Sequence, residues 1–311
     1  MATVLVTGGS GMIGTALSKA LVNKGHDVII LTRHPEDPKN GTSAFKYAKW
    51  NIEEGYIEEA AIKTADHIVH LAGANVADGR WTEKRKKEIV DSRVLSGQLL
   101  AKTLSAVENK VQTIVSASAI GWYGPDPQVP NLRPFREDDP ADAAFLGNTS
   151  RLWEEAIETV RDLGKRLVTL RIGIVLSTEG GAYAEFRKPL RFGAASVLGN
   201  GNQMISWIHI DDLVSLIMYS IDNPSIHGVY NAVAPAPVNN REMITGIAKE
   251  KGGFYVTAPV PEFVLKMMLG EMSVEVLKSA TVSAQKIQQA GFVFLHSTLQ
   301  SALKDLNQKA S

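Results

Sequence analysis

Short apolar runs alternate with longer helical patterns over residues 1–175 of the chain. The apolar runs predict strands at Val4–Thr7, Asp27–Thr32, Phe45–Lys49, His67–Leu71, Thr113–Ser116 and Leu167–Leu170. Runs this continuous are typical of strands that are covered on both faces. Helical spacing predicts helices over Met12–Asn23, Glu83–Val107 and Arg151–Leu163. The alternation favours an α/β fold with a Rossmann-type, doubly wound parallel sheet and right-handed crossovers.

The pattern changes after residue 176, where glycines at 180, 181, 193, 199 and 201 interrupt it. A strand is predicted at Ile205–Ile210, a helix from about Asp211, and mainly short helices from Asn240 to a last one at Ser297–Asn307. We therefore predict a Rossmann domain over residues 1–176, to which the chain can return around 205–235. Residues 177–311 form a smaller C-terminal α/β lobe, and the cleft between the two parts is the expected substrate site.

Glycines 8, 9, 11 and 14 follow the first predicted strand and open the first predicted helix. A chain that turns sharply, approaches a pyrophosphate and packs a helix near the sheet leaves no room for Cβ atoms. The helix N-terminus offers free N–H groups and a positive dipole end to phosphates. We therefore predict a dinucleotide site here rather than a purely structural turn. Its expected contacts are Thr7, Gly8, Gly9, Ser10, Gly11, Met12, Ile13 and Gly14.

The residue that follows the second strand indicates which dinucleotide is bound. NAD sites usually carry a carboxylate about 20 residues after the glycines, whereas this chain has Arg33 there. A guanidinium can pair with a 2′-phosphate that a carboxylate would repel. NADP(H) is therefore favoured over NAD(H), with a solvated strand-end charge as the alternative.

Composition and charge narrow the class of protein further. Lys plus Arg equals Asp plus Glu at 33 each, which argues against bulk attraction to nucleic acid or to a membrane surface. The chain has no cysteine, so disulfides, thiol nucleophiles and cysteine metal sites are excluded. Its first apolar run is too short for a signal peptide, and no run approaches a membrane span. A cytoplasmic location is expected.

Several motifs resemble those of the extended short-chain dehydrogenase/reductases, which include nucleoside-diphosphate-sugar epimerases and dehydratases. The shared residues are Thr7-Gly8, Gly11, Gly14, His70-Leu71-Ala72-Gly73, Ser116, Ser118 and Tyr123-Gly124. Further stretches resemble the atypical "epimerase family protein" subgroup: Arg80-Trp81-Thr82, Asp91-Ser92-Arg93, Ser116–Gly124, Trp153-Glu154, Gly180-Gly181-Ala182 and Ser206–Asp212. The resemblance covers essentially the whole chain, including a helical segment around Gly270–Leu303.

The resemblance implies further cofactor contacts. These are Thr32 and Arg33 at the adenosine ribose phosphate, Asn51 and Ile52 near adenine, Leu71, Ala72 and Gly73 beneath the nicotinamide ribose, and Arg93 facing the cofactor. Members of the subgroup often carry Glu after the Ala-Gly pair. This chain has Ala74 there, so any polar contact of that Glu is missing.

Typical members of the superfamily use a Tyr-x-x-x-Lys pair on one helix as acid and base, and this chain has no such pair. Ser118 matches the family's substrate-holding serine, with a structural hydroxyl at a strand end as the alternative. Tyr123 is the candidate proton donor, with a structural hydrogen bond as the alternative. Arg151 stands where the lysine normally lies but is too weak an acid to replace it.

Other charged groups are candidate binding sites. Arg187 and Arg191 are candidate contacts to a phosphorylated or nucleotide-linked substrate, with a solvated helix face as the alternative. His209 with Asp211 and Asp212 suggests a helix cap rather than a metal site, because no second histidine lies at a ligand-like spacing. No metal is expected.

The sequence thus predicts an NADP(H)-binding, epimerase-like oxidoreductase of atypical short-chain type. The expected partner is a small-molecule substrate, for example a nucleotide-linked one. No contact with nucleic acid or with a membrane is expected. The alternative is a non-catalytic NADP(H)-binding sensor, which the missing pair favours.

Overall fold

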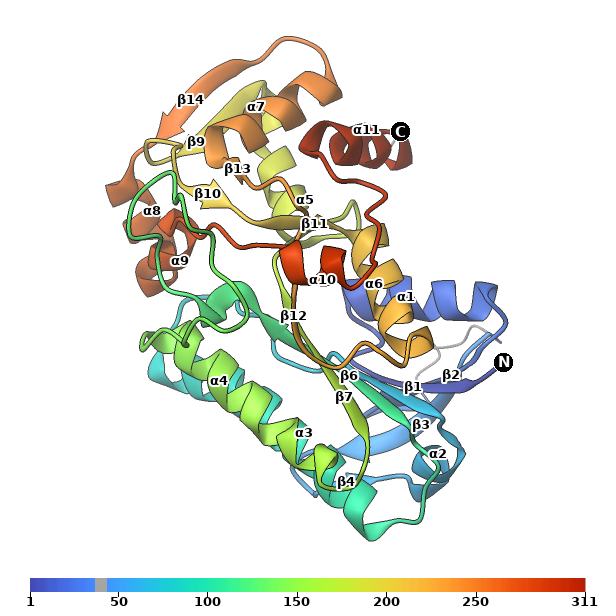
Figure 1. Ribbon diagram of the computed structural model, residues 1–311. Helices are drawn as coiled ribbons and strands as arrows, with labels where there is room; N and C mark the ends of the chain where they lie inside the picture. The colour runs from blue at the N-terminus through green and yellow to red at the C-terminus, as the bar shows by residue number, and fades with distance from the viewer. Residues whose placement is uncertain (37–43, 311) are drawn as a thin grey trace.

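The computed structural model describes residues 1–36 and 44–310 (Figure 1). Among them, eight strands form one sheet in the order β12-β7-β6-β5-β1-β2-β3-β4. The strands are β1 (Thr3–Thr7), β2 (Asp27–Thr32), β3 (Lys46–Asn51), β4 (Tyr56–Ile57), β5 (His67–His70), β6 (Thr113–Ala119), β7 (Arg166–Ile172) and β12 (Gly228–Ala232). All pairs are parallel except β3 with β4. This confirms the predicted Rossmann-type α/β sheet. The strands follow one another outward from β1 in both directions, as in a doubly wound sheet.

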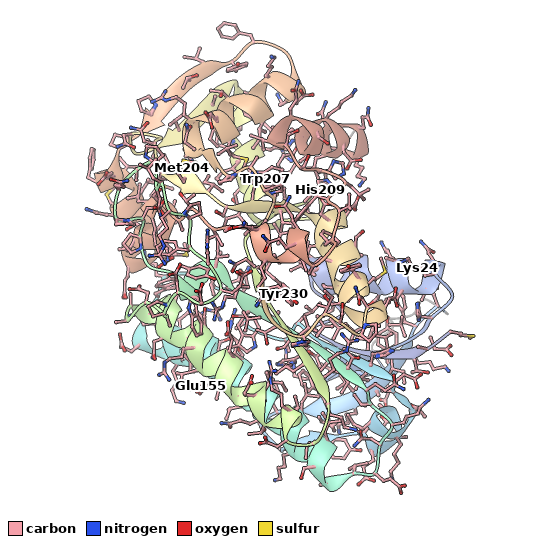
Figure 2. All side chains as sticks on the ribbon, in the orientation of Figure 1. Lys24, Glu155, Met204, Trp207, His209 and Tyr230 are labelled. Carbon is pink, nitrogen blue, oxygen red and sulfur yellow. The ribbon has the colours of Figure 1, made fainter. Side chains whose placement is uncertain are left out.

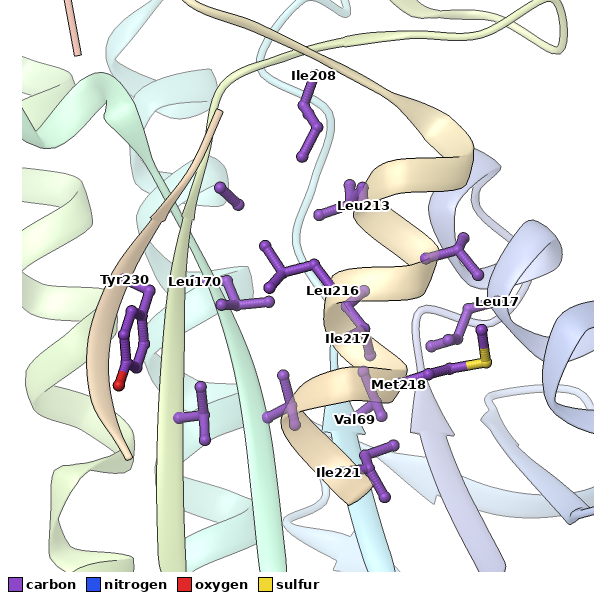
Figure 3. Packing of buried hydrophobic residues seen from close by; sticks show 14 of the residues in the cluster. Leu17, Val69, Leu170, Ile208, Leu213, Leu216, Ile217, Met218, Ile221 and Tyr230 are labelled. Atoms are coloured by element: carbon purple, nitrogen blue, oxygen red, sulfur yellow. The ribbon is translucent and has the colours of Figure 1, made fainter. Parts of the chain in front are cut away.

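Helices cover both faces of the sheet. On one face, α1 (Met12–Asn23) and α6 (Ile210–Asp222) pack with the sheet in a single buried cluster. Figure 3 shows Leu213, Leu216 and Ile217 of α6 directed at the strands and Leu17 of α1 beside them. The other face is covered by α2 (Glu59–Thr64) and α3 (Glu83–Ala106), against which α4 (Phe145–Glu158) packs. Residues from 210 to 232 therefore complete the eight-stranded sheet and its covering layer.

The rest of the C-terminal part has a core of its own, centred on Trp207, Val197, Ile244 and Leu303. Its strands are β8 (Ile174–Leu176), β9 (Ala194–Leu198), β10 (Met204–Ile205), β11 (Trp207–His209), β13 (Val238–Asn239) and β14 (Val256–Val260). They pair two by two as β11 with β8, β10 with β13 and β14 with β9. Its helices are α5 (Gly181–Arg187), α7 (Asn240–Lys251), α8 (Glu262–Leu269), α9 (Ser273–Leu277), α10 (Gln285–Gln289) and α11 (Leu299–Lys309). In Figure 1 this part lies above the sheet, with α11 beside α7.

Most predicted elements differ from the observed ones by a few residues at one end, and two differ more. The helix expected from Arg151 begins at Phe145, because the polar residues of its first turns are satisfied within it: the Thr149 hydroxyl donates to the Phe145 carbonyl at 2.6 Å. The strand expected over Ile205–Ile210 is two short strands, and α6 already begins at Ile210. The two strands are separated at Ser206, because β10 pairs with Val238–Asn239 whereas β11 pairs with Ile174–Leu176.

None of the helices within residues 1–36 and 44–310 combines the length and the apolar character that crossing a membrane requires.

Candidate dinucleotide-binding site

The glycine turn between β1 and α1 is too tight to accept side chains. Gly8 has a positive φ of 69°, and a Cβ on it would lie 2.9 Å from the Leu71 carbonyl carbon. A Cβ on Gly14 would lie 2.2 Å from the Gly8 carbonyl oxygen, and one on Gly9 would strike the Ile30 side chain. Contacts below 3 Å to fixed backbone cannot relax cheaply, so glycine is required at positions 8 and 14. This is the close packing that the pyrophosphate-binding turn of a Rossmann fold needs.

The N-terminus of α1 is available to an anion. Gly11 is its N-cap residue and supplies no side chain to cap the helix, and the first turn carries no acidic residue. Ser10 and Gly11 are exposed, and Met12 and Ile13 are half-buried. Backbone N–H groups without intrahelical partners, at the positive end of a twelve-residue helix, favour phosphate oxygens.

Thr7 supports this turn from inside. Its hydroxyl accepts hydrogen bonds from the amides of Leu71 and Ala72, each at 3.1 Å, and lies 2.8 Å from Nδ1 of His70. Both side chains are fully buried. The Thr7 side chain therefore ties the ends of β1 and β5 together, and its predicted contact with the cofactor stays a prediction.

The ends of β2 and β3 lie side by side, because Thr32 pairs with Lys49 in a parallel ladder. Arg33 follows β2 with an exposed side chain. Asn51 ends β3, and its side-chain oxygen accepts the amides of Glu53 and Glu54. The structure thus brings the residues predicted for the adenosine end to one edge of the sheet, with Arg33 in reach of solvent.

Arg93 lies against the segment that follows β5. Its guanidinium donates to the carbonyls of Ala74 and Ile89 at 3.0 and 2.9 Å, and stacks 4.8 Å from the Trp153 ring centre. A Cβ on Gly73 would lie 3.1 Å from the Arg93 guanidinium carbon, so the two positions fit each other closely. Burial, with a smaller effect from Arg85, lowers the pKa of Arg93 to about 10, and the group is still charged at neutral pH. Arg93 therefore places a positive charge beside the end of β5.

Ser118 lies near the end of β6 and is only 2 % exposed. Its hydroxyl donates a 2.6 Å hydrogen bond to Glu154 Oε1. Glu154 in turn forms a two-pronged ion pair with Arg171, in which Nε–Oε1 is 2.8 Å and Nη2–Oε2 is 3.0 Å. The candidate serine therefore has its one proton engaged by a carboxylate, and its free lone pairs can only accept.

Tyr123 is fully buried. Its hydroxyl donates to Asn231 Oδ1 at 2.7 Å and accepts from Arg171 at 3.1 Å. Burial is the main effect on this phenol, and it raises the pKa of Tyr123 to about 12 although Arg171 acts in the opposite direction. These contacts favour the structural alternative over the proton donor, whose role stays a prediction.

The helix α4 explains why the usual tyrosine is missing. The resemblance implies that Arg151 stands where the lysine normally lies, so the tyrosine would stand four residues earlier, at Gly147. A Cβ there would lie 2.2 Å from the Asp142 carbonyl oxygen, so no side chain fits. Arg151 itself is bound to Glu155 and Asn148 on the exposed side of the helix. The backbone around α4 thus excludes the standard tyrosine–lysine arrangement.

A cavity of about 560 Å³ lies where the C-terminal part meets the loop around Pro130. Amide side chains line much of it: Asn200, Asn202, Gln203 and Asn239. Arg187 and Arg191 are not among its lining residues, and Arg187 instead lies 5.6 Å from the Tyr183 ring centre. Their predicted role in substrate binding stays a prediction.

Sequence reasoning missed Arg171 and the role of Glu154. The indication for Arg171 was a charged residue inside the apolar run of β7, which has to be paired when it is buried. Its partner could not be found from spacing, since Glu154 lies on a different element.

Comparison with known proteins agrees with this geometry. The sequence model of the NAD dependent epimerase/dehydratase family matches residues 4–232, and a domain of unknown function, DUF1731, matches residues 260–306. The epimerase family protein YfhF of Bacillus subtilis is 34 % identical over 304 residues, which cover 97 % of each chain. The human epimerase family protein SDR39U1, solved with NADPH, is 30 % identical with a TM-score of 0.87 and covers 98 % of this chain and 99 % of its own. A nucleoside-diphosphate sugar epimerase from Corynebacterium glutamicum is 28 % identical with a TM-score of 0.75, over 99 % of this chain and 58 % of its own. This chain belongs to the NAD dependent epimerase/dehydratase family.

Proposed function

We propose that this protein binds NADP(H) on the Gly8–Gly14 turn and acts as an epimerase-like oxidoreductase on a small substrate. The observation that carries the proposal is the combination of an uncapped α1 N-terminus with the exposed Arg33 at the end of β2. The first can hold the pyrophosphate and the second can pair with a 2′-phosphate. The human relative solved with NADPH supports the same choice of cofactor.

The cofactor preference is tested by titrating the protein with NADPH and with NADH. We expect NADPH to bind roughly tenfold or more tightly, since charge-assisted bonds to one phosphate contribute about 1.5–3 kcal/mol. Arg33→Glu should weaken NADPH binding by at least that factor and leave NADH binding nearly unchanged. Arg151→Glu, at an exposed arginine on α4, is the matched control and should change neither affinity. Equal affinities of the unaltered protein for the two dinucleotides would refute the preference.

The bound dinucleotide supplies or accepts a hydride, and the chain must hold the reacting carbon close to it. Ser118 at the end of β6 is the proposed contact to the substrate oxygen. Because its proton is engaged by Glu154, it can accept a hydrogen bond from a substrate hydroxyl. Arg171 holds the Glu154 carboxylate in place for that purpose. The amides that line the 560 Å³ cavity suit a substrate rich in hydroxyl or carbonyl groups.

A specific observation favours a second function, a non-catalytic NADP(H)-binding sensor. The position of the usual tyrosine is closed at Gly147, and the hydroxyls of Ser118 and Tyr123 are both engaged inside the protein.

One experiment separates the two functions. The protein is incubated with NADPH and a panel of carbonyl compounds and sugar nucleotides, and absorbance and products are followed. Turnover that Ser118→Ala abolishes without weakening NADPH binding supports the enzyme. Tight NADPH binding with no turnover across the panel supports the sensor.

A further inference from the structure

Outside the dinucleotide site, a group of side chains that could hold a metal ion lies where α11 meets the first turn of α6. It contains His209 and Asp211 at the start of α6, His296 before α11 and Asp305 on α11. One ligand atom from each of the four residues lies within 4.8 Å of all the others. Figure 2 shows His209 at this junction between the central sheet and the C-terminal part. The pair of histidines could not be predicted from spacing, because His209 and His296 are far apart in the chain and meet only in the folded structure.

The buried member of this group has an unsatisfied nitrogen. The His209 side chain is fully buried, and among the described residues its Nε2 makes no hydrogen bond of acceptable geometry. Asp305 Oδ2 nevertheless lies only 3.1 Å from this nitrogen. Two ligands of a tetrahedral divalent ion, each about 2.0–2.1 Å from it, are separated by roughly 3.3 Å. The pair therefore has the spacing of two ligands directed at one point.

The other two members complete a mixed donor set. The His296 ring centre lies 4.0 Å from that of His209, and its Nδ1 is 3.0 Å from the Ser301 hydroxyl. An outer bond of this kind on one ring nitrogen orients the other nitrogen toward a metal. Asp211 Oδ2 lies 3.9 Å from His209 Nδ1 and supplies a second carboxylate. Two imidazoles with two carboxylates are a donor set that Zn²⁺ and its neighbours prefer.

A lysine now lies between the two carboxylates. Lys309 Nζ is 2.5 Å from Asp211 Oδ2 and 2.8 Å from Asp305 Oδ2. Its side chain is 42 % exposed and comes from the last turn of α11, so it can rotate away into solvent. Lys309 is thus a built-in cation that a divalent ion would have to displace.

We propose that His209, Asp211, His296 and Asp305 form a binding site for one divalent transition-metal ion of the Zn²⁺ class, in competition with Lys309. His209 Nδ1 accepts the Asp211 amide at 3.1 Å, so the neutral ring carries its proton on Nε2. Binding at Nε2 moves this proton to Nδ1 and breaks that cap bond, and the ion takes the place of Lys309 in its ion pairs with Asp211 and Asp305. The ion fastens α11 to the start of α6, which packs on the dinucleotide-binding sheet.

The test uses the full chain, stripped with a chelator and titrated with ZnCl₂ by calorimetry and with Co²⁺ by absorption. We expect one ion per chain and a Co²⁺ spectrum of tetrahedral type. His296→Ala should weaken binding at least tenfold, whereas His227→Ala, at an exposed histidine elsewhere, should not. Lys309→Met should strengthen binding roughly tenfold, because removing one nearby positive charge is worth on the order of 1.4 kcal/mol. Lys304→Met, at an exposed lysine of the same helix, is its control.

Circular dichroism and NADPH affinity show whether each variant is folded. Absence of stoichiometric binding by the unaltered chain overturns the proposal, as does binding that His296→Ala leaves intact. In either case the four side chains are a plain polar contact that holds α11. An increase in affinity on removal of a lysine is not expected of adventitious binding to surface histidines.

Discussion

The Thr7 hydroxyl and His70 Nδ1 lie 2.8 Å apart beneath the glycine turn, and this contact fixes the form of the histidine. The hydroxyl already accepts two amides, so its own proton points to Nδ1. His70 Nε2 then carries the ring proton and faces the Ser96 hydroxyl at 3.3 Å. Full burial lowers the pKa of His70 to about 4, so the ring is neutral at physiological pH. A neutral histidine therefore joins β1, β5 and α3 below the site.

This neutral histidine makes stability depend on pH. The ordinary pKa of 6.5 applies to the unfolded chain, so between pH 6.5 and 4 the unfolded state binds more protons than the folded state. The stabilising effect of the neutral ring is complete above pH 6.5. As the pH falls toward 4, the free energy of unfolding decreases by up to about 3 kcal/mol. The free energy of unfolding, measured with denaturant at several pH values, should have a shallower slope against pH for His70→Asn than for the unaltered protein. His227→Asn, at an exposed position, should leave the slope unchanged. Equal slopes for His70→Asn and the unaltered protein would contradict this account.

The glycine turn allows a test of how side chains would clash with the backbone. Gly14→Ala places a Cβ 2.2 Å from the Gly8 carbonyl oxygen, so the turn has to move. We expect a loss of about 1–3 kcal/mol in stability and a large loss in NADPH affinity. Gly11→Ala is the comparison, because its nearest contact is 3.3 Å and its backbone is ordinary. Thermal unfolding and NADPH titration should place Gly11→Ala between Gly14→Ala and the unaltered protein, and identical behaviour of the two variants would rule out the steric explanation.

Two of the arginine–glutamate pairs that involve α4 differ in burial and should differ in energy. Arg171 and Glu154 have side chains that are 3 % and 11 % exposed, whereas Arg151 and Glu155 are 43 % and 56 % exposed. Arg171→Met leaves a buried carboxylate unpaired, for which about 3–5 kcal/mol is expected. Arg151→Met should cost no more than about 1 kcal/mol. Chemical denaturation measures both, and a similar cost for the two would show that Glu154 is not held by this pair.

Tyr123 offers a test of its own role. The phenol with a pKa of about 12 should not ionise with the exposed tyrosines when absorbance is followed from neutral to alkaline pH. Tyr123→Phe removes the bonds to Asn231 and Arg171 and should lower stability by about 1–3 kcal/mol. NADPH affinity should not change. Retained stability together with lost turnover would instead support Tyr123 as the proton donor.

The sequence alone predicted the parts of the molecule that depend on neighbouring residues. The strand–turn–helix from β1 to α1 is determined locally, because four glycines within seven residues permit one tight turn and the residues after them have helical spacing. The bounds of β2 and α1 follow the predicted ones residue by residue. Strand–helix alternation is likewise a local property, and it was sufficient for the fold class.

Tertiary structure decided which polar groups meet. Ser118 and Glu154 are 36 positions apart, and Tyr123 and Asn231 are 108 apart, so no spacing rule joins them. Burial and the contacts with Asn231 and Arg171 set the pKa of the Tyr123 phenol, and neither can be derived from the sequence. The backbone path before α4 closed Gly147 to any side chain. Packing of α11 on α6 brought His296 to His209. The chemistry of a buried group depends on its partners and on its separation from water, and both are fixed only when distant segments pack together.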